Sequence, residues 1–211
     1  MIRPSADNIS RHIRHLVGER NPYTSPKALQ SAGRYIAKQF LSLDLRVWEE
    51  DIEFDGCKTC NIVGVKQGTA QTPEVFVVGA HYDTVTGTPG ADDNASAVAA
   101  LLELARCLDP IPLTTTLVFA AFTLEEYGFV GSKHFLREAQ AKNIPIRGMI
   151  SLEMLGFRNR QPGSQRYPAY VDSSIYPDTG DFIAVVGNDI SRNLTLSLVD
   201  EMQKASPELK V

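Results

Sequence analysis

The sequence has few cysteines and no long hydrophobic run. Its three cysteines, Cys57, Cys60 and Cys107, cannot all pair within one chain of 211 residues. That number argues against a disulfide scaffold and favours a reducing compartment. The longest apolar runs, such as residues 75–80 and 117–122, have the length of a strand, whereas a membrane-spanning helix needs about 20 apolar residues. We therefore expect no membrane partner.

The sequence also lacks an excess of basic charge. The formal net charge is −4, and lysine and arginine are scattered along the chain. This distribution lacks the basic patch that is typical of nucleic-acid binding, so we expect no nucleic-acid partner. The N-terminal residues turn polar at once and lack the apolar stretch of a secretory signal. We expect a cytoplasmic protein, or a secreted one whose leader has been removed; the sequence does not indicate an oligomeric state.

The spacing of apolar residues predicts an α/β protein. Two helices and a β-hairpin open the chain, and buried strands then alternate with amphipathic helices. The predicted strands are 45–54, 61–65, 75–81, 114–122, 146–153 and 182–186. The predicted helices are 8–17, 25–43, 95–107, 131–141 and 191–204. This pattern is typical of a three-layer α/β/α fold around a central mixed, mostly parallel sheet. We predict a single domain over residues 1–211, with a loop at 157–177.

Polar side chains with metal-binding chemistry lie at the ends of three predicted strands and at the start of one helix. They are His81, Asp83, Asp92, Glu125, Glu126 and Glu153. In α/β sheets, ligands bind beyond the carboxyl ends of the strands, so these side chains are expected to meet. Adjacent carboxylates such as Glu125 and Glu126 do not both ionise cheaply unless water or a cation is near. One imidazole with several carboxylates suits zinc, and the sequence therefore predicts a metal site.

Four segments of this region resemble, in order and spacing, those of the M28 family of metallopeptidases. They are His81-x-Asp83, Gly90-Ala91-Asp92-Asp93-Asn94-Ala95-Ser96, Glu125-Glu126-x-Gly128-x-x-Gly131-Ser132 and Ser151-Leu152-Glu153-Met154. The resemblance covers roughly residues 20–211. It implies the zinc exopeptidase type of α/β fold and an aminopeptidase activity on peptide substrates.

The resemblance also implies which residues bind metal. His81 and Glu153 would hold a first zinc ion, Glu126 would hold a second, and Asp92 would bridge the two. A cis peptide bond would follow the bridging aspartate, at Asp92–Asp93.

The same resemblance implies two catalytic roles. Asp83 would orient the imidazole of His81, as carboxylates commonly do for ligating histidines. Glu125 would be the general base that takes a proton from a zinc-activated water and returns it to the leaving amine. Cleavage would be limited to the N-terminal residue of the peptide.

The sequence departs from the family pattern towards its C-terminal end. The family's second metal ion takes a further histidine from a Ser-Asp-His-like segment, but His12, His15 and His134 all precede the place where it would stand. We interpret the chain as truncated, in preference to a natural short form with a defective second site. We therefore expect the fold to lack its C-terminal elements, one metal ion to bind better than two, and little peptidase activity. Relatives often have aspartate at the position of Glu153.

Three other functions stay open. A glutaminyl cyclase resembles this fold but uses a single zinc ion, and an inactive relative could serve as a binding module. Cys57-x-x-Cys60 could be a redox pair or half of a structural zinc site, although the absence of a second such pair favours an incidental spacing.

Overall fold

The structure, a computed structural model, describes residues 2–71 and 74–211. This part of the chain divides into two compact units, Met1–Gly156 and Phe157–Val211. Every predicted site residue belongs to the first unit. That residues 1–211 form a single domain stays a prediction.

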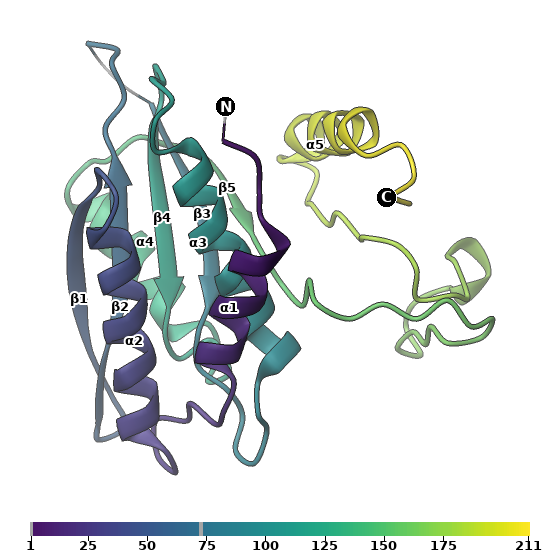
Figure 1. The fold of residues 1–211 in the computed structure, drawn as a ribbon, viewed down its shortest axis with the longest axis horizontal. Coiled ribbons are helices and arrows are strands. Elements are labelled where there is room, and N and C mark those ends of the chain that lie inside the picture. The colour runs from purple at the N-terminus through teal and green to yellow at the C-terminus, as the bar shows by residue number, and fades with distance from the viewer. Residues whose placement is uncertain (1, 72–73) are drawn as a thin grey trace. The chain divides into compact units, whose positions relative to one another are not determined.

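The described residues of the first unit form one sheet of five strands. These are β1 (Arg46–Phe54), β2 (Cys57–Lys66), β3 (Val75–His81), β4 (Thr116–Phe122) and β5 (Ile146–Ser151). The strand order is β1-β2-β4-β3-β5 (Figure 1). β2 pairs antiparallel with β1 and β4, whereas β3 pairs parallel with β4 and β5. β2 thus runs against the other four strands, and the predicted mixed, mostly parallel sheet is confirmed.

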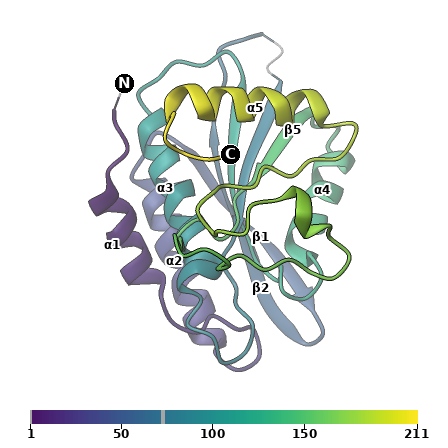
Figure 2. The same cartoon turned by 90° about the vertical axis from the view of Figure 1, so that its right-hand side faces the viewer.

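Helices cover both faces of this sheet. α1 (Ala6–Leu16), α2 (Pro26–Leu41) and α3 (Ala97–Leu108) lie on one face, and α4 (Val130–Ala141) lies on the other (Figures 1 and 2). The larger hydrophobic core packs the first three helices against residues such as Phe119. On the opposite face, the rings of Phe122 and Phe135 meet with centroids 5.7 Å apart. The three-layer α/β/α architecture is therefore confirmed.

The hairpin is more regular than the sequence predicts. β2 begins at Cys57, four residues before the predicted strand start at Asn61, and pairs with the full length of β1. The connection is the dipeptide Asp55-Gly56, in which both φ angles are positive, 44° and 75°. Such a two-residue turn matches the twist of the flanking strands and sets their register. The sequence shows this turn, but the polar residues that follow it hide the start of the strand.

The second unit contains little regular structure among its described residues. It has one helix, α5 (Arg192–Ala205), and a short helical turn at Ser173–Ile175. The predicted loop at 157–177 is confirmed apart from that turn. The predicted strand at 182–186 is wrong, because this segment is irregular and the amide of Ile183 pairs only with the carbonyl of Lys210. An apolar run becomes a strand only where another strand satisfies its backbone groups.

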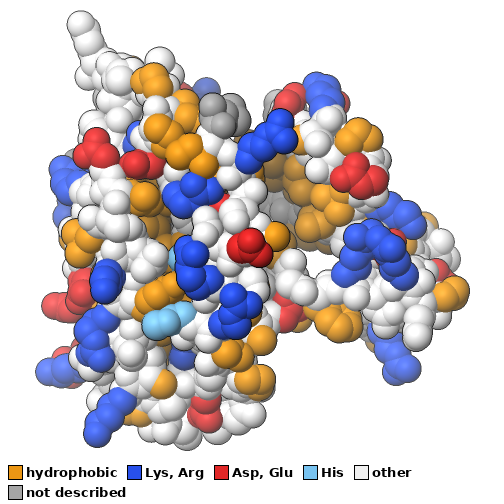
Figure 3. Space-filling model, in the orientation of Figure 1, with side chains coloured by type: hydrophobic (Ala, Val, Ile, Leu, Met, Phe, Trp, Pro, Cys, Tyr) orange, Lys and Arg blue, Asp and Glu red, His pale blue; other side chains and the backbone are white. Residues whose placement is uncertain are grey.

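Surface side chains of both charges are interspersed with uncharged ones on the face shown in Figure 3. None of the helices in the described ranges has the length and apolar character that a membrane crossing requires. The charge pattern of this face gives no direct indication of a partner.

Candidate metal centre

The predicted ligands come from neighbouring strand ends. β3 ends at His81, Glu125 follows β4 by three residues, and Glu153 follows β5 by two. Since β3 pairs parallel with both β4 and β5, all three carboxyl ends reach the same edge of the sheet. The structure thus brings together side chains that lie more than 70 positions apart in the sequence.

His81 is the centre of the cluster. Its side chain is almost fully buried, with the residue 4% exposed. Its Nε2 atom lies 3.1 Å from Asp93 Oδ1, 3.4 Å from Glu153 Oε2 and 3.9 Å from Glu125 Oε2. Two overlapping groups of potential ligand atoms result, His81 with Asp93 and Glu153, and His81 with Glu125 and Glu126. Within each group the ligand atoms lie within 4.8 Å of one another.

The acidic turn differs from the prediction in which aspartate it directs into the cluster. Asp93, not Asp92, lies beside His81. Asp92 Oδ1 instead accepts hydrogen bonds from Ser96 Oγ (3.1 Å) and from the amide of Gly156 (2.7 Å). The cis peptide bond is likewise at Asp93–Asn94, so the prediction of Asp92–Asp93 is wrong by one position.

The physical reason is the irregular backbone of the turn. Residues Ala91–Ser96 form a widened helical turn that leaves helical geometry at Asp93, where φ is −99° and ψ is 93°. Adjacent side chains on a helix point in directions about 100° apart, so a distortion here decides which carboxylate faces the cluster. Two neighbouring aspartates are indistinguishable by sequence spacing alone.

Asp83 contacts residues at the ends of two strands, β3 and β4. Its carboxylate is fully buried, with Oδ1 3.5 Å from Nδ1 of His81. Oδ1 also accepts a hydrogen bond from the amide of Glu125 (3.1 Å), and Oδ2 accepts one from the amide of Glu126 (3.3 Å). The preceding Leu124 is buried and has a φ of 56°, which turns these two amides away from the strand direction. Asp83 thus lies against the imidazole and holds the main chain of the glutamate pair.

Asn94 is a positioning residue that the sequence pattern alone did not indicate. It is fully buried, and its Nδ2 atom donates to the carbonyl of Leu152 (3.1 Å) and to Glu153 Oε2 (3.0 Å). Its Oδ1 atom accepts from the amide of Met154 (3.1 Å). Asn94 therefore holds the Glu153 segment against the acidic turn. Its position directly after Asp92 and Asp93 is the sequence feature that could have indicated this role.

The electrostatics of the cluster show a deficit of positive charge. Burial lowers the pKa of His81, but Asp83 and Glu153 outweigh it and raise that pKa to about 10. Burial and neighbouring carboxylates raise the pKa values of Glu125 and Glu126, although the charge of His81 opposes this. Within residues 2–71 and 74–211, three buried atoms of the cluster have no hydrogen-bond partner: His81 Nδ1, Asp93 Oδ1 and Glu126 Oε1. Unpaired buried oxygens among carboxylates and an imidazole fit a divalent metal such as zinc.

The other candidate residues lie elsewhere. His12 Nδ1 lies 2.7 Å from the hydroxyl of Tyr35, and His15 stacks on the same ring. The Cys60 thiol contacts Glu49 Oε2 at 3.7 Å, and burial together with Glu49 raises its pKa to about 12. A thiol that keeps its proton is a poor metal ligand or nucleophile, so this arrangement favours the incidental reading of Cys57-x-x-Cys60.

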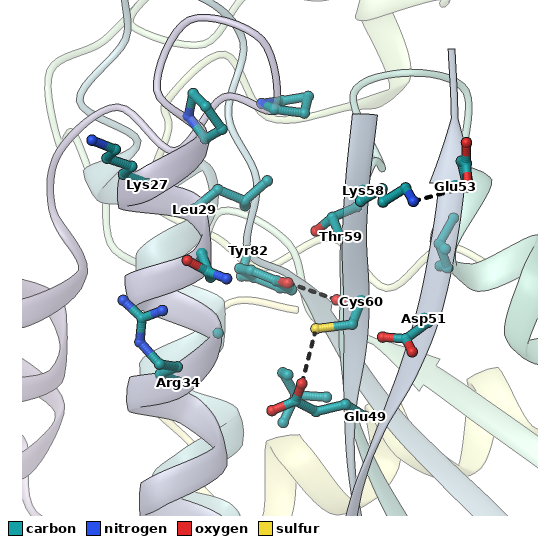
Figure 4. A pocket seen from close by; sticks show the side chains of 16 residues that line it. Lys27, Leu29, Arg34, Glu49, Asp51, Glu53, Lys58, Thr59, Cys60 and Tyr82 are labelled. Atoms are coloured by element: carbon teal, nitrogen blue, oxygen red, sulfur yellow. Dashed lines mark hydrogen bonds and ion pairs between the residues drawn. The ribbon is translucent and has the colours of Figure 1, made fainter. Parts of the chain in front are cut away.

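A groove of about 740 Å³ lies between α2 and the β1–β2 hairpin (Figure 4). Charged side chains of both signs line it, including Arg34 from α2 and Asp51 from β1. Tyr82 also lines this groove and donates a hydrogen bond from its hydroxyl to the carbonyl of Cys60 (2.6 Å). None of the candidate metal ligands lines the groove, so it is separate from the carboxylate cluster.

A mixed sheet between helix layers, with an imidazole and carboxylates at its carboxyl edge, defines a protein of the zinc exopeptidase class. The model of peptidase family M28 matches residues 61–196, more than half of the chain. The chain therefore belongs to peptidase family M28.

Similar proteins agree with this assignment. An uncharacterized protein of Escherichia coli, YfbL, is 38% identical over 195 residues, which cover 87% of this chain and 60% of that protein. The aminopeptidase YwaD of Bacillus subtilis is 38% identical over 100 residues, 46% of this chain and 22% of that one. The crystal structure of the LapA aminopeptidase of Legionella pneumophila has the same fold, with a TM-score of 0.73 at 21% identity, and the match covers 99% of this chain and 52% of LapA. The chain thus spans less than two thirds of each of these proteins.

Proposed function

We propose that this chain carries the zinc site and the general base of an aminopeptidase, with His81, Asp93, Glu126 and Glu153 as metal ligands and Glu125 as base. One observation carries the proposal: Asp93, Glu125 and Glu153 converge within 3.9 Å of a single imidazole nitrogen. Asp93 replaces Asp92 in the ligand set, because only its carboxylate belongs to a potential ligand group.

The geometry favours one strong metal site over two equal ones. Both potential groups include His81. Its Nδ1 atom faces Asp83. Only Nε2 is directed at the carboxylates of Asp93 and Glu153, so His81 would serve a single ion. His81, Asp93 and Glu153 then give three ligands with room for a fourth, the usual arrangement of a catalytic zinc site. Asp93 and Glu126 would contribute to a weaker second site. A bound zinc ion would supply Lewis-acid polarisation of a substrate carbonyl and acidify a water molecule.

Glu125 has the properties of a general base. Its side chain is 28% exposed, so it reaches both the cluster and solvent. Burial and the neighbouring carboxylates raise its pKa, against the opposing charge of His81. A carboxylate with a raised pKa accepts a proton from water more readily and can return it to the leaving amine. Asp83, through the amide of Glu125, keeps this residue beside the cluster.

The test compares metal binding and product chemistry in the same protein. Zinc should bind the chain with one ion much tighter than a second, as measured by competition with a chromophoric chelator. Aminoacyl chromogenic substrates should release free amino acids, slowly because the second site is weak. Glu125→Gln should lower the rate by about 100- to 10,000-fold and leave tight binding of the first ion intact. The control Glu138→Gln changes a glutamate that pairs with Lys142 on α4, and it should have no effect.

Three results would contradict this proposal. A chain that binds no zinc would remove the metal site, and full activity in Glu125→Gln would remove the base. Formation of pyroglutamyl product from N-terminal glutamine, in place of released amino acids, would support the cyclase alternative.

A further inference from the structure

Arg20 is a buried cation beneath the metal-binding edge of the sheet. The residue is 2% exposed and follows α1 in the chain. Its guanidinium donates to main-chain carbonyls: Nε to Tyr82 (2.7 Å), Nη2 to Gly90 (2.9 Å), and Nη1 to Gly18 (2.7 Å) and Leu16. In the part of the chain that the structure describes, no carboxylate lies within ion-pairing distance of it. A buried arginine that binds carbonyls only has a structural role other than charge pairing.

Two of these carbonyls belong to the segments that supply the metal ligands. Tyr82 lies between His81 and Asp83, and Gly90 precedes the turn that contains Asp93. Arg20 thus links the two segments through one planar group. Its main chain reinforces the link, since its amide donates to Thr84 Oγ1 (2.9 Å) and its carbonyl accepts from the amide of Thr84 (3.2 Å).

The contact between Arg20 and the turn is close. Gly90 has a φ of 55°, and a Cβ atom there would lie 2.6 Å from Nη2 of Arg20 and 2.3 Å from Cγ2 of Thr84. A side chain at position 90 would therefore push the turn away from the guanidinium. Glycine allows the carbonyl of this residue to reach the arginine while its backbone keeps a left-handed conformation.

The position of Arg20 also places positive charge near the acidic cluster. Burial lowers the pKa of Arg20 to about 10, while the charges of Asp83 and Asp93 oppose this shift. The group is therefore charged at neutral pH. Lysine would keep the charge but has no planar fork of donors, so it would not bridge several carbonyls at once.

We propose that Arg20 is a positioning residue for the metal centre, which fixes the His81–Asp83 segment relative to the Asp93 turn. The carboxylate of Asp93 then meets Nε2 of His81 at a distance suited to a shared ion. This inference rests on the proposed zinc site.

The test compares Arg20→Lys and Arg20→Gln with a matched control, Arg106→Gln. Arg106 also anchors the N-terminal region, since it donates to the carbonyl of Arg3 and pairs with Glu103 on α3, but it contacts no ligand segment. Zinc affinity is measured by competition with a chromophoric chelator, the Co²⁺ complex by its visible absorption, and stability by thermal unfolding without metal. Arg20→Lys should lower zinc affinity about 10- to 100-fold and change the Co²⁺ spectrum. Arg106→Gln should lower the unfolding temperature but keep wild-type zinc affinity.

Each outcome decides the inference. Wild-type zinc affinity in a folded Arg20→Lys protein would overturn it, as would losses of affinity in Arg20→Lys and Arg106→Gln that simply follow their losses of stability. If Arg20→Gln does not fold, the lysine variant suffices, with faster amide hydrogen exchange in residues 81–84 and 90–94 as the expected second measurement. Unchanged exchange there would contradict the positioning role. Absence of zinc binding by the wild-type chain would instead refute the proposed function.

Discussion

Acidic side chains at two places in the first unit, Glu103 on α3 and the carboxylates at the rim of the sheet, differ in how completely they are hydrogen-bonded. Glu103 on α3 is 2% exposed, yet its oxygens are fully used. They accept hydrogen bonds from Arg106 Nη2 (2.7 Å), from the amide of Ser5 (2.6 Å) and from Asn8 Nδ2 (3.2 Å). The hydrogen bonds from Arg106 are the main reason that the pKa of Glu103 is lowered to about 2.

Two rim carboxylates, Asp93 and Glu126, are less completely hydrogen-bonded than Glu103. Burial raises the pKa values of Asp93 and Glu126, and among the described residues one oxygen of each is buried without a hydrogen bond. The chain supplies a dedicated cation, Arg106, for Glu103, whereas at the rim several carboxylates share the single imidazole of His81. The same residue type thus stabilises the fold in one place and, we propose, binds a metal ion in the other.

The largest effect should come from the neighbouring aspartates of the acidic turn. Asp93→Asn should lower zinc affinity on the order of 1,000-fold, about 4 kcal/mol, because it removes a charged ligand. Asp92→Asn should change it by less than about threefold, since an amide oxygen still accepts the hydrogen bonds from Ser96 and Gly156. Chelator competition measures both. Equal losses would mean that both aspartates bind the ion, and a loss confined to Asp92→Asn would restore the original prediction.

A change at Glu103 should have the reverse effect, with a loss of stability and no loss of zinc affinity. Glu103→Ala should reduce the free energy of unfolding by about 2–3 kcal/mol, because it leaves Arg106 and two further donors without their acceptor. Zinc affinity should stay at the wild-type value. Denaturant unfolding gives the stability, and a weaker zinc complex in this variant would mean that the two regions are coupled.

The pH dependence of stability should carry the signature of Glu103. Its folded-state pKa of about 2 lies below the unfolded value, which is about 4.3. Its contribution is therefore fully present above about pH 4.3 and is lost as the pH falls towards 2. Thermal unfolding of wild type and Glu103→Ala between pH 6 and pH 2 isolates the contribution of Glu103 to stability, because the other titrating groups are common to both proteins. Parallel curves would show that Glu103 does not titrate as expected.

The smallest of these effects is expected at Gly90. Gly90→Ala should destabilise the metal-free chain by about 1–2 kcal/mol, the cost of a positive φ at a residue with a side chain. Because the added methyl group would displace Thr84 and Arg20, zinc affinity should also fall, by about tenfold. Gly87→Ala is a matched control, with a φ of 81° but no atom within 4 Å of the added Cβ. It should share the loss of stability and keep wild-type zinc affinity.

Most of the fold was predictable from local pattern. The strand at Val75–His81 has the predicted bounds, and α4 starts only one residue before its prediction. Here the apolar runs are buried between helices, so pattern and environment agree. The predictions fail where strand formation depends on a neighbouring strand. The apolar run at 182–186 found no neighbouring strand, and β2 begins early because the Asp55-Gly56 turn aligns it with β1.

The candidate site was predictable in its chemistry but not in its detail. Sequence order identified His81, Glu125, Glu126 and Glu153, which the structure brings to one edge. Which of the two neighbouring aspartates, Asp92 or Asp93, faces the imidazole depends on a backbone distortion that residue spacing does not encode.

The amino-acid sequence alone determined the layers of the fold, the residue types of the site and the family, because apolar periodicity and motif order are local properties. Only the tertiary structure decided which aspartate faces the imidazole, that Asp83 supports two strand ends, and that a buried Arg20 joins the ligand segments. These relations depend on distances between segments far apart in the chain, and such distances exist only after the strands have paired and the helices have packed.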